Sequence, residues 1–113
     1  MIKHYLAARN ELTSKGGPFE VTTVDVRGIP LKAYANAPAS LRVLWEASAA
    51  FGDKDYIVYE DERYTYADIH AQVRKLAAYL VAHGVKRHSR VAIAMRNYPE
   101  WVVAYWATVS LGA

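Results

Sequence analysis

The chain has four histidines, whose side chains could bind a metal ion: His4, His70, His83 and His88. A metal site on a helix needs two such side chains three or four residues apart, so that both rings reach one ion. No pair here has that spacing. His83 falls in an expected last helical turn, where a partly positive ring suits the helix dipole. We therefore expect solvated or helix-capping roles for the histidines.

Serine and glycine patterns do not form a catalytic or phosphate-binding motif. Ser110 lacks the first glycine of a GxSxG nucleophile elbow, and it lies inside an expected helix. Residues 14–17, Ser-Lys-Gly-Gly, are loop-like but follow no apolar strand, so we interpret them as a helix terminator. None of the six glycines belongs to a GxGxxG or GxxxxGK[ST] motif.

Three charged or polar clusters are further candidates. The carboxylates of residues 60–62 could attract a hard cation, but their place between tyrosine-rich strands favours a solvated hairpin turn. Residues 96–98 follow an apolar strand, at the end where open α/β sheets bind ligands; helix capping and packing is the alternative. A basic cluster could meet a phosphate on a nucleotide or CoA, although its place before that strand favours a charged loop; it consists of Lys86, Arg87, His88 and Arg90. We assign no catalytic, cofactor-binding or metal-binding residue.

Length and composition limit the class of protein. The chain has 113 residues, 53% hydrophobic and 22% charged, which fits about one globular domain or a piece of a larger one. The absence of cysteine excludes a disulfide framework, thiol catalysis and cysteine zinc sites. A net charge of +3, without a basic stripe interleaved with aromatics, argues against a nucleic-acid partner. No apolar stretch is long enough for a signal peptide or a transmembrane helix, so we expect a cytoplasmic protein.

The sequence pattern predicts three segments that position the candidate residues. In residues 1–18 an amphipathic start that ends in Gly-Gly-Pro predicts a helix and a linker. Residues 19–35 predict a β-hairpin, because β-branched residues alternate on either side of an Arg-Gly turn. Residues 36–113 alternate helices with strands, which is typical of an α/β subdomain.

Within residues 36–113 the pattern predicts three helices and a hairpin. Thr65 and Asp68 form a capping box that begins a helix with one apolar stripe. The run at 90–95 is apolar without alternation, which is typical of a strand covered on both faces. Helix 99–111 is apolar nearly all round and should be covered on more than one side. We therefore expect an α/β fold with an incomplete, mostly parallel sheet flanked by helices.

Three segments carry a resemblance to a known family. Residues 59–69, YEDERYTYADI, fit a hairpin that leads into a T-[YF]-x-[ED]-[LI] helix start. Residues 90–101, RVAIAMRNYPEW, fit R-V-A-I-x-x-x-N-x-x-E-[FW], and residues 109–113, VSLGA, fit the closing x-x-x-G-A. In this order they resemble the acyl-CoA synthetases of the AMP-dependent synthetase and ligase superfamily, the adenylate-forming enzymes. The likeness covers roughly residues 40–113, and residues 19–35 resemble the leading hairpin of bacterial fatty-acid members.

The resemblance implies an N-terminal portion of the large domain of an AMP-forming fatty-acid CoA ligase, truncated after a helix. In such an enzyme a carboxylate attacks ATP with Mg²⁺ to give an acyl-adenylate, and the thiol of CoA then displaces AMP. The family's Ser/Thr/Gly loop ending in Pro-Lys-Gly, its later acidic residues and its C-terminal lysine are not in these 113 residues. We therefore expect this chain alone to be inactive, to hold no cofactor, and to self-associate through exposed apolar surface.

The sequence departs from the family pattern at one point, and one other class of function stays open. His88-Ser89 stands where family members often have Gly-Asp, which affects the turn before the apolar strand. The alternative function is a non-catalytic α/β module that binds a partner or a nucleotide. A reading frame that continues past Ala113 into a Thr/Ser/Gly loop would favour the ligase, and a stop codon there would favour the module.

Overall fold

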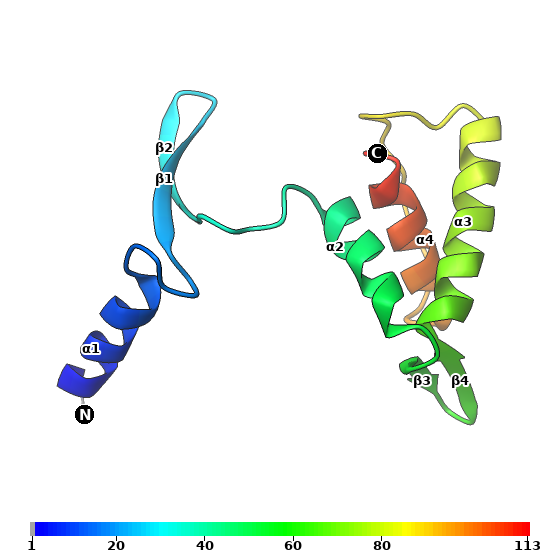
Figure 1. The fold of residues 1–113 in the computed structure, drawn as a ribbon. Coiled ribbons are helices and arrows are strands. Elements are labelled where there is room, and N and C mark those ends of the chain that lie inside the picture. The colour runs from blue at the N-terminus through cyan, green and yellow to red at the C-terminus, as the bar shows by residue number, and fades with distance from the viewer. Residues whose placement is uncertain (1) are drawn as a thin grey trace. The chain divides into compact units, whose positions relative to one another are not determined.

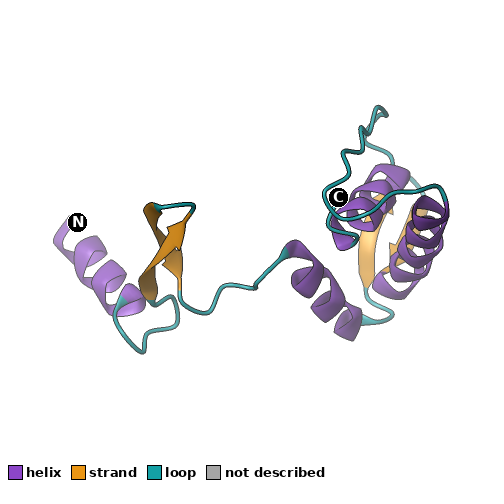
Figure 2. Cartoon of the chain, turned by 90° about the horizontal axis from the view of Figure 1, so that it is seen from above, coloured by secondary structure: helices purple, strands orange, loops and turns teal. Residues whose placement is uncertain are grey.

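The computed structural model describes residues 2–113, which form two compact units, residues 2–38 and 39–113. Figures 1 and 2 show the helices and strands of each unit. The chain is mixed α/β with a leading hairpin, as the sequence predicts. The first unit contains α1 (Ile2–Thr13), β1 (Val21–Val26) and β2 (Ile29–Tyr34).

Helix α1 ends where hydroxyl groups take up its last carbonyl oxygens. Thr13 Oγ1 donates a hydrogen bond to the carbonyl oxygen of Arg9 at 2.8 Å. Ser14 Oγ donates to that of Glu11 at 2.9 Å. These bonds satisfy carbonyls that have no partner at a helix C-terminus. Residues 14–17 are therefore the predicted helix terminator and not a phosphate-binding loop.

The hairpin between β1 and β2 is set by its two-residue turn. Arg27 and Gly28 both have positive φ, 56° and 83°, which is the type I′ geometry that matches the twist of paired strands. The Gly28 amide also donates to Asp25 Oδ1 at 2.9 Å. The hairpin predicted for residues 19–35 is confirmed, with its strands at Val21–Val26 and Ile29–Tyr34.

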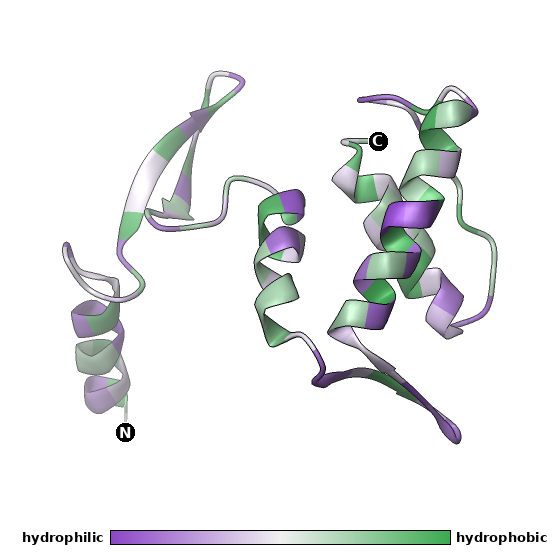
Figure 3. Ribbon diagram, turned by 45° about the vertical axis from the view of Figure 1, so that its right-hand side comes forward, coloured by the Kyte–Doolittle hydropathy of each residue, from purple (hydrophilic) through white to green (hydrophobic). Residues whose placement is uncertain are grey.

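The strand register places apolar side chains on one face of this hairpin. Val24 pairs with Leu31 and Val26 with Ile29, and directly opposite residues share a face. All four side chains are exposed. Green hydrophobic segments mark both strands in Figure 3. No residue from 2 to 38 is buried, so this unit has no core of its own.

The second unit, residues 39–113, consists of three α-helices, a short 3₁₀ turn and a second hairpin. Two local signals explain where its helices begin. The Ser40 side chain accepts a hydrogen bond from the Val43 amide and caps the first of them. Pro99 opens the last one at its first position. The elements are α2 (Leu41–Ser48), η1 (Ala49–Phe51), β3 (Asp55–Tyr59), β4 (Glu62–Thr65), α3 (Tyr66–Ala82) and α4 (Pro99–Ser110).

The predicted capping box at the start of α3 is present. Thr65 Oγ1 accepts from the Asp68 amide at 3.1 Å, and Asp68 Oδ2 accepts from the Thr65 amide at 3.0 Å. The Asp68 carboxylate also accepts from the Thr65 hydroxyl at 2.7 Å. These bonds satisfy donors that a helix N-terminus leaves free. They hold the pKa of Asp68 below its ordinary 3.8, first through the hydroxyl bond and then through the amide bond.

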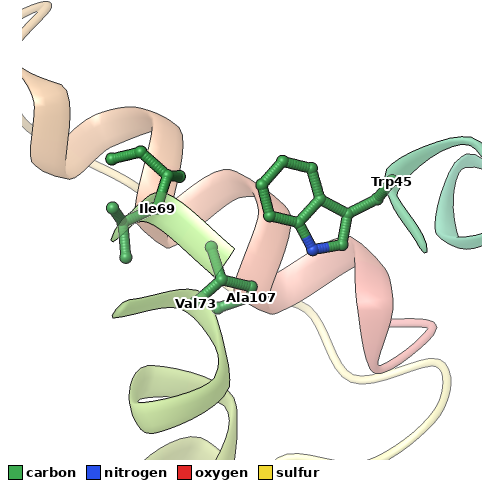
Figure 4. Close-up of a cluster of buried hydrophobic side chains, with 5 residues drawn as sticks. Trp45, Ile69, Val73 and Ala107 are labelled. Carbon is green, nitrogen blue, oxygen red and sulfur yellow. The ribbon is translucent and has the colours of Figure 1, made fainter. Parts of the chain in front are cut away.

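The core of the second unit lies where α4 contacts both α2 and α3 (Figure 1). Ile69 and Ala107 are fully buried. Figure 4 shows the Trp45 indole of α2 directed towards the side chains of α3 and α4. The apolar stripe predicted for α3 therefore faces the core. The buried cluster is Trp45, Ile69, Val73, Val103 and Ala107.

One predicted strand does not form among residues 2–113. Residues 90–95 are neither helix nor strand, and the strand pairs of the structure are two antiparallel hairpins. The physical reason is that a strand needs a hydrogen-bonded neighbour, and no strand within residues 2–113 pairs with this segment. The burial also alternates, with Val91 and Ile93 half-buried and Ala92 and Ala94 exposed. The expectation of a parallel strand covered on both faces is therefore wrong for these residues.

Helix α4 is only partly covered, despite its apolar composition. Val103 and Ala107 are buried, whereas Trp101, Val102 and Tyr105 are half-buried.

In the part of the chain that the structure describes, no helix has both the length and the hydropathy that a bilayer crossing needs.

Candidate functional site

A cleft of about 400 Å³ lies beside Trp45 in the second unit. Its floor is apolar, and its rim carries the side chains of Arg42, Glu46 and Arg74. Arg42 Nε and Glu46 Oε1 form an ion pair at 2.7 Å one helical turn apart. The remaining lining residues are Ala49, His70, Val73, Ala77, Ser110 and Leu111. This composition resembles a packing groove with a charged rim more than a catalytic pocket.

His70 lies in the wall of this cleft and is 8% exposed. Its ring stacks on the Trp45 indole with centroids 3.8 Å apart and planes 11° from parallel. Trp45 in turn stacks on Trp106 at 4.8 Å, so side chains from α3, α2 and α4 form a continuous column. Solvated or capping roles were expected for the histidines, and that expectation is wrong for His70. Its ring instead joins α3 to α2.

Ser48 and His70 form a pair that looks like a catalytic dyad but is oriented for structure. Ser48 Oγ lies 3.0 Å from His70 Nε2. The Ser48 hydroxyl donates its proton to the Trp45 carbonyl oxygen at 2.6 Å. The Nε2–H group of His70 must therefore donate to Ser48 Oγ, whereas general-base activation would require Nε2 to accept the serine proton. This arrangement does not make Ser48 a nucleophile.

The electrostatic setting of His70 favours the neutral ring. Burial lowers its pKa below the ordinary 6.5, and the positive charge of Arg74 lowers it further. A neutral imidazole donating one hydrogen bond and stacking on an indole is consistent with a packing role.

Ser110 lies in the last turn of α4, as the sequence predicts, and borders the same cleft. Its Oγ is buried without a hydrogen-bond partner among residues 2–113. Its hydroxyl is not on a strand-to-helix turn and has no basic side chain bonded to it, so the structure gives no means of activating it.

The other histidines lie away from this cleft. His83 Nδ1 is 2.8 Å from the Tyr79 carbonyl oxygen in the last turn of α3, which confirms its helix-end position. His4 and His88 are exposed. No group of three or more histidines, cysteines or carboxylates that could hold a metal ion comes together within residues 2–113.

The carboxylates of residues 60–62 form an exposed hairpin end. Glu60 and Asp61 make the turn, and Glu62 already belongs to β4. Glu62 Oε2 accepts a hydrogen bond from the Tyr64 hydroxyl at 2.6 Å, which raises the tyrosine pKa. The predicted solvated turn is thus present, but it covers residues 60–61 and not 60–62.

The basic cluster, Lys86, Arg87, His88 and Arg90, occupies the exposed loop after α3. The His88 amide donates to the Gly112 carbonyl oxygen at 2.8 Å, which ties the loop to the end of α4. His88 has a φ of 68°, a left-handed conformation that glycine would adopt at less cost. This is the turn where the sequence departs from the family pattern. The loop is charged, as expected, but no sheet edge lies above it.

Residues 96–98 do not lie at the end of a sheet strand, because residues 90–95 form none. Tyr98 occupies the N-cap position of α4 without a side-chain cap. Its ring meets that of Tyr59 edge-on at 5.7 Å. The ring contact supports the packing part of the alternative, and no side chain of residues 96–98 caps the helix.

Sequence reasoning missed the aromatic column, although a signal was present. His70 stands next to Ile69, and Val73 and Ala77 follow His70 at steps of three and seven. That spacing places His70 on the edge of the apolar stripe, where burial is the more natural expectation.

Comparisons with known proteins match this chain to one family and to several relatives. The family model described as AMP-binding enzyme matches residues 44–113. The medium/long-chain-fatty-acid–CoA ligase FadD6 of Mycobacterium tuberculosis is 39% identical over 95 residues, which is 81% of this chain and 16% of that protein. A long-chain-fatty-acid–CoA ligase of Bacillus subtilis is 33% identical over 70 residues, 62% of this chain and 12% of that protein.

A third relative carries a different enzyme name. The acetyl-coenzyme A synthetase of Brucella anthropi is 38% identical over 71 residues, which is 63% of this chain and 10% of that protein. The chain thus spans less than a fifth of the length of these relatives. No solved structure matches it. The family match covers more than half of the chain and includes the whole buried core, so the chain belongs to the family of AMP-binding enzymes.

Proposed function

We propose that this chain is part of an ATP-dependent carboxylate–CoA ligase that acts on fatty acids through an acyl-adenylate. The observation that supports this most directly is the family match over residues 44–113, together with relatives whose names are fatty-acid CoA ligases. The whole enzyme would use ATP, Mg²⁺ and CoA, and would work in the cytoplasm. Residues 36–113 would be the start of the α/β subdomain in its large N-terminal domain.

The chain's own share of this activity is scaffolding. The Ser48–His70 pair is oriented to hold α2 against α3, and Ser110 has no activating base. The Tyr56 hydroxyl accepts from Trp106 Nε1 at 2.8 Å, which fixes β3 against α4. Fixed elements of this kind support reacting groups that other segments supply. The 113-residue chain by itself should therefore form no acyl-adenylate.

The test compares two proteins from one gene. The polypeptide encoded by the complete reading frame is incubated with ATP, Mg²⁺ and a series of fatty acids, and pyrophosphate, acyl-AMP and acyl-CoA are measured. We expect pyrophosphate release that depends on the acid, and acyl-CoA only when CoA is added. The matched control is the 113-residue chain under the same conditions, which should release no pyrophosphate.

Two results would contradict the proposal. A complete protein that forms no acyl-adenylate with any carboxylic acid would favour the non-catalytic binding module. Pyrophosphate release by the 113-residue chain would contradict its role as a scaffold.

A further inference from the structure

The cleft beside Trp45 continues into a second concavity of the second unit. This second concavity has a volume of about 350 Å³, and it shares the lining residues Arg42, Ser110 and Leu111 with the first. The two therefore form one groove, called here the arginine groove. Its walls come from α2, from α3 and from the C-terminal end of α4. The residues that the second concavity adds are Ser40, Arg87, Val109 and Gly112.

The floor of the arginine groove is apolar and its walls are helical. Val73 is buried in the floor, and Ala77 and Leu111 are half-buried. An apolar surface with a polar rim is typical of a site that binds another protein. The backbone groups of helical walls are mostly bonded within their own helices, so an extended peptide finds no free edge for strand pairing. A helix, which satisfies its own backbone, is the element that fits this groove.

The rim of the groove carries unbalanced positive charge. Among the described residues that line it, Glu46 is the one acid, and Arg42 balances its charge in the ion pair at 2.7 Å. Arg74 and Arg87 are exposed, and in the part of the chain that the structure describes neither of them is in an ion pair. Residues 69–99 contain no aspartate or glutamate. Two guanidinium groups on the rim are therefore available to carboxylates of a partner.

Arg87 is positioned at the end of the groove by the residues around it. The His88 amide donates a hydrogen bond to the Gly112 carbonyl oxygen at 2.8 Å, which holds the loop against the end of α4. The Arg87 stem passes over Gly112, where a β-carbon would lie 3.2 Å from Arg87 Cγ. Gly112 thus leaves room for the arginine stem. A stem that is already held loses less conformational freedom when its guanidinium group binds a carboxylate.

We propose that the arginine groove docks an acidic amphipathic helix of a partner protein. Apolar side chains of this helix would cover the floor, and carboxylates beside its apolar stripe would pair with Arg74 and Arg87. A second copy of this chain does not supply such a helix, because α1, α2, α3 and α4 each carry a single carboxylate. A concave groove also suits a helix better than the flat surface of a bilayer. The inference goes beyond the ligase activity and does not depend on it.

Binding of a designed peptide tests the proposal. The probe is a fluorescein-labelled amphipathic peptide of about 15 residues, long enough to be helical, with leucines on one stripe and glutamates on both flanks. The control probe has a lysine in place of each glutamate. Fluorescence anisotropy is measured with the polypeptide encoded by the complete reading frame and with the 113-residue chain. We expect saturable binding of the acidic probe and binding at least about tenfold weaker for the lysine probe. Equal binding of the two probes, or no saturable binding of the acidic one, would overturn the proposal.

Charge reversal locates the binding on the groove. Arg74→Glu and Arg87→Glu should each weaken binding of the acidic probe by about tenfold, because each replaces an attraction by a repulsion. The matched control is Lys75→Glu, the same change of charge at an exposed residue next to Arg74 that does not line the groove. It should change binding by less than about twofold. Circular dichroism should show the same helix content for the three variants, since all three side chains are exposed. Equal losses of binding for the three would indicate unspecific attraction and contradict the proposal.

Two further measurements distinguish other occupants. Binding of the acidic probe by the 113-residue chain but not by the complete polypeptide would mean that another segment of the same polypeptide fills the groove, which would overturn the proposal. Co-sedimentation with phosphatidylglycerol vesicles that Arg74→Glu and Arg87→Glu abolish, without saturable binding of the probe, would assign these cations to a membrane surface and overturn it as well. These outcomes are separate from that of the ligase assay, because probe binding requires neither ATP nor a fatty acid.

Discussion

The two units of this chain have similar local order but very different burial. Residues 2–38 contain a helix and a hairpin with well-formed turns, yet none of their side chains is buried. Residues 39–113 bring five apolar side chains from three helices into one cluster. Both units obey the same rules of capping and turn formation. The difference shows that local signals decide where an element begins and ends, whereas stability comes from packing between elements.

The largest effect should come from removing Trp45, the side chain that joins α2 to the core. Trp45→Ala should lower the free energy of unfolding of the second unit by about 3–5 kcal/mol, as for other buried large-to-small changes. Urea unfolding followed by far-ultraviolet circular dichroism measures it. The matched control is Phe19→Ala in the first unit, where the ring is 54% exposed. A similar loss of unfolding free energy for both variants would mean that the first unit buries its apolar side chains as the second unit does.

Acidification should weaken the second unit through His70. The pKa of its ring is lowered in the folded state, so between that value and the ordinary 6.5 the unfolded chain binds more protons. The free energy of unfolding is therefore highest above pH 6.5 and falls as the pH drops below it. We expect a smaller loss than for Trp45→Ala.

The variant His70→Gln isolates this effect, because glutamine can still donate to Ser48 but does not titrate. Urea unfolding at several pH values should give a flatter profile for His70→Gln than for the unchanged chain. Parallel profiles would assign the pH dependence to other groups.

Removing the capping box should have an intermediate effect on the free energy of unfolding. Thr65→Ala should destabilise the second unit by about 1 kcal/mol, the usual value for an N-cap threonine or serine. The Asp68 carboxyl contributes only while ionised, and its pKa lies below 3.8. The difference between Thr65→Ala and the unchanged chain should therefore persist at neutral pH and shrink as the pH falls below 3.8. A difference independent of pH would show that Asp68 takes no part.

The smallest effect should come from the hairpin of the first unit. Val24→Thr should change the free energy of unfolding by no more than about 0.5 kcal/mol, because Val24 is exposed in the chain. The same change in the core, Val73→Thr, should cost about 1–3 kcal/mol, because it places a polar hydroxyl where a methyl group is buried. Thermal unfolding of the two variants measures both. Equal losses of unfolding free energy would indicate that Val24 is buried in solution, against another part of this chain or against another molecule.

The sequence was sufficient wherever a structure depends on neighbouring residues. The Thr65–Asp68 box, the Arg27-Gly28 turn, the terminator at 14–17 and the proline start of α4 follow from steric and hydrogen-bonding rules within a few residues. They appear in the structure at the predicted positions.

The rest depends on residues that are far apart in the chain. His70 is buried because Trp45 stacks on it, and its Nε2–H donates a hydrogen bond to Ser48 Oγ, 22 residues away in the chain. The bond from Trp106 to Tyr56 joins residues 50 positions apart. Residues 90–95 have the composition of a strand, but composition cannot supply the neighbour that a strand requires. For the same reason the pattern could exclude familiar catalytic motifs but could not reveal the aromatic column.

The hairpin turn at Arg27 and Gly28 has a practical consequence for handling the protein. It holds Val24, Val26, Ile29 and Leu31 on one exposed face of a two-stranded hairpin, and exposed apolar strands with unpaired edges favour intermolecular β-pairing. Asp25 and Lys32 carry the nearby charges, but they lie on the opposite face and leave this one unguarded. We expect light scattering of the purified chain to rise with concentration, and a single lysine on the apolar face to suppress it.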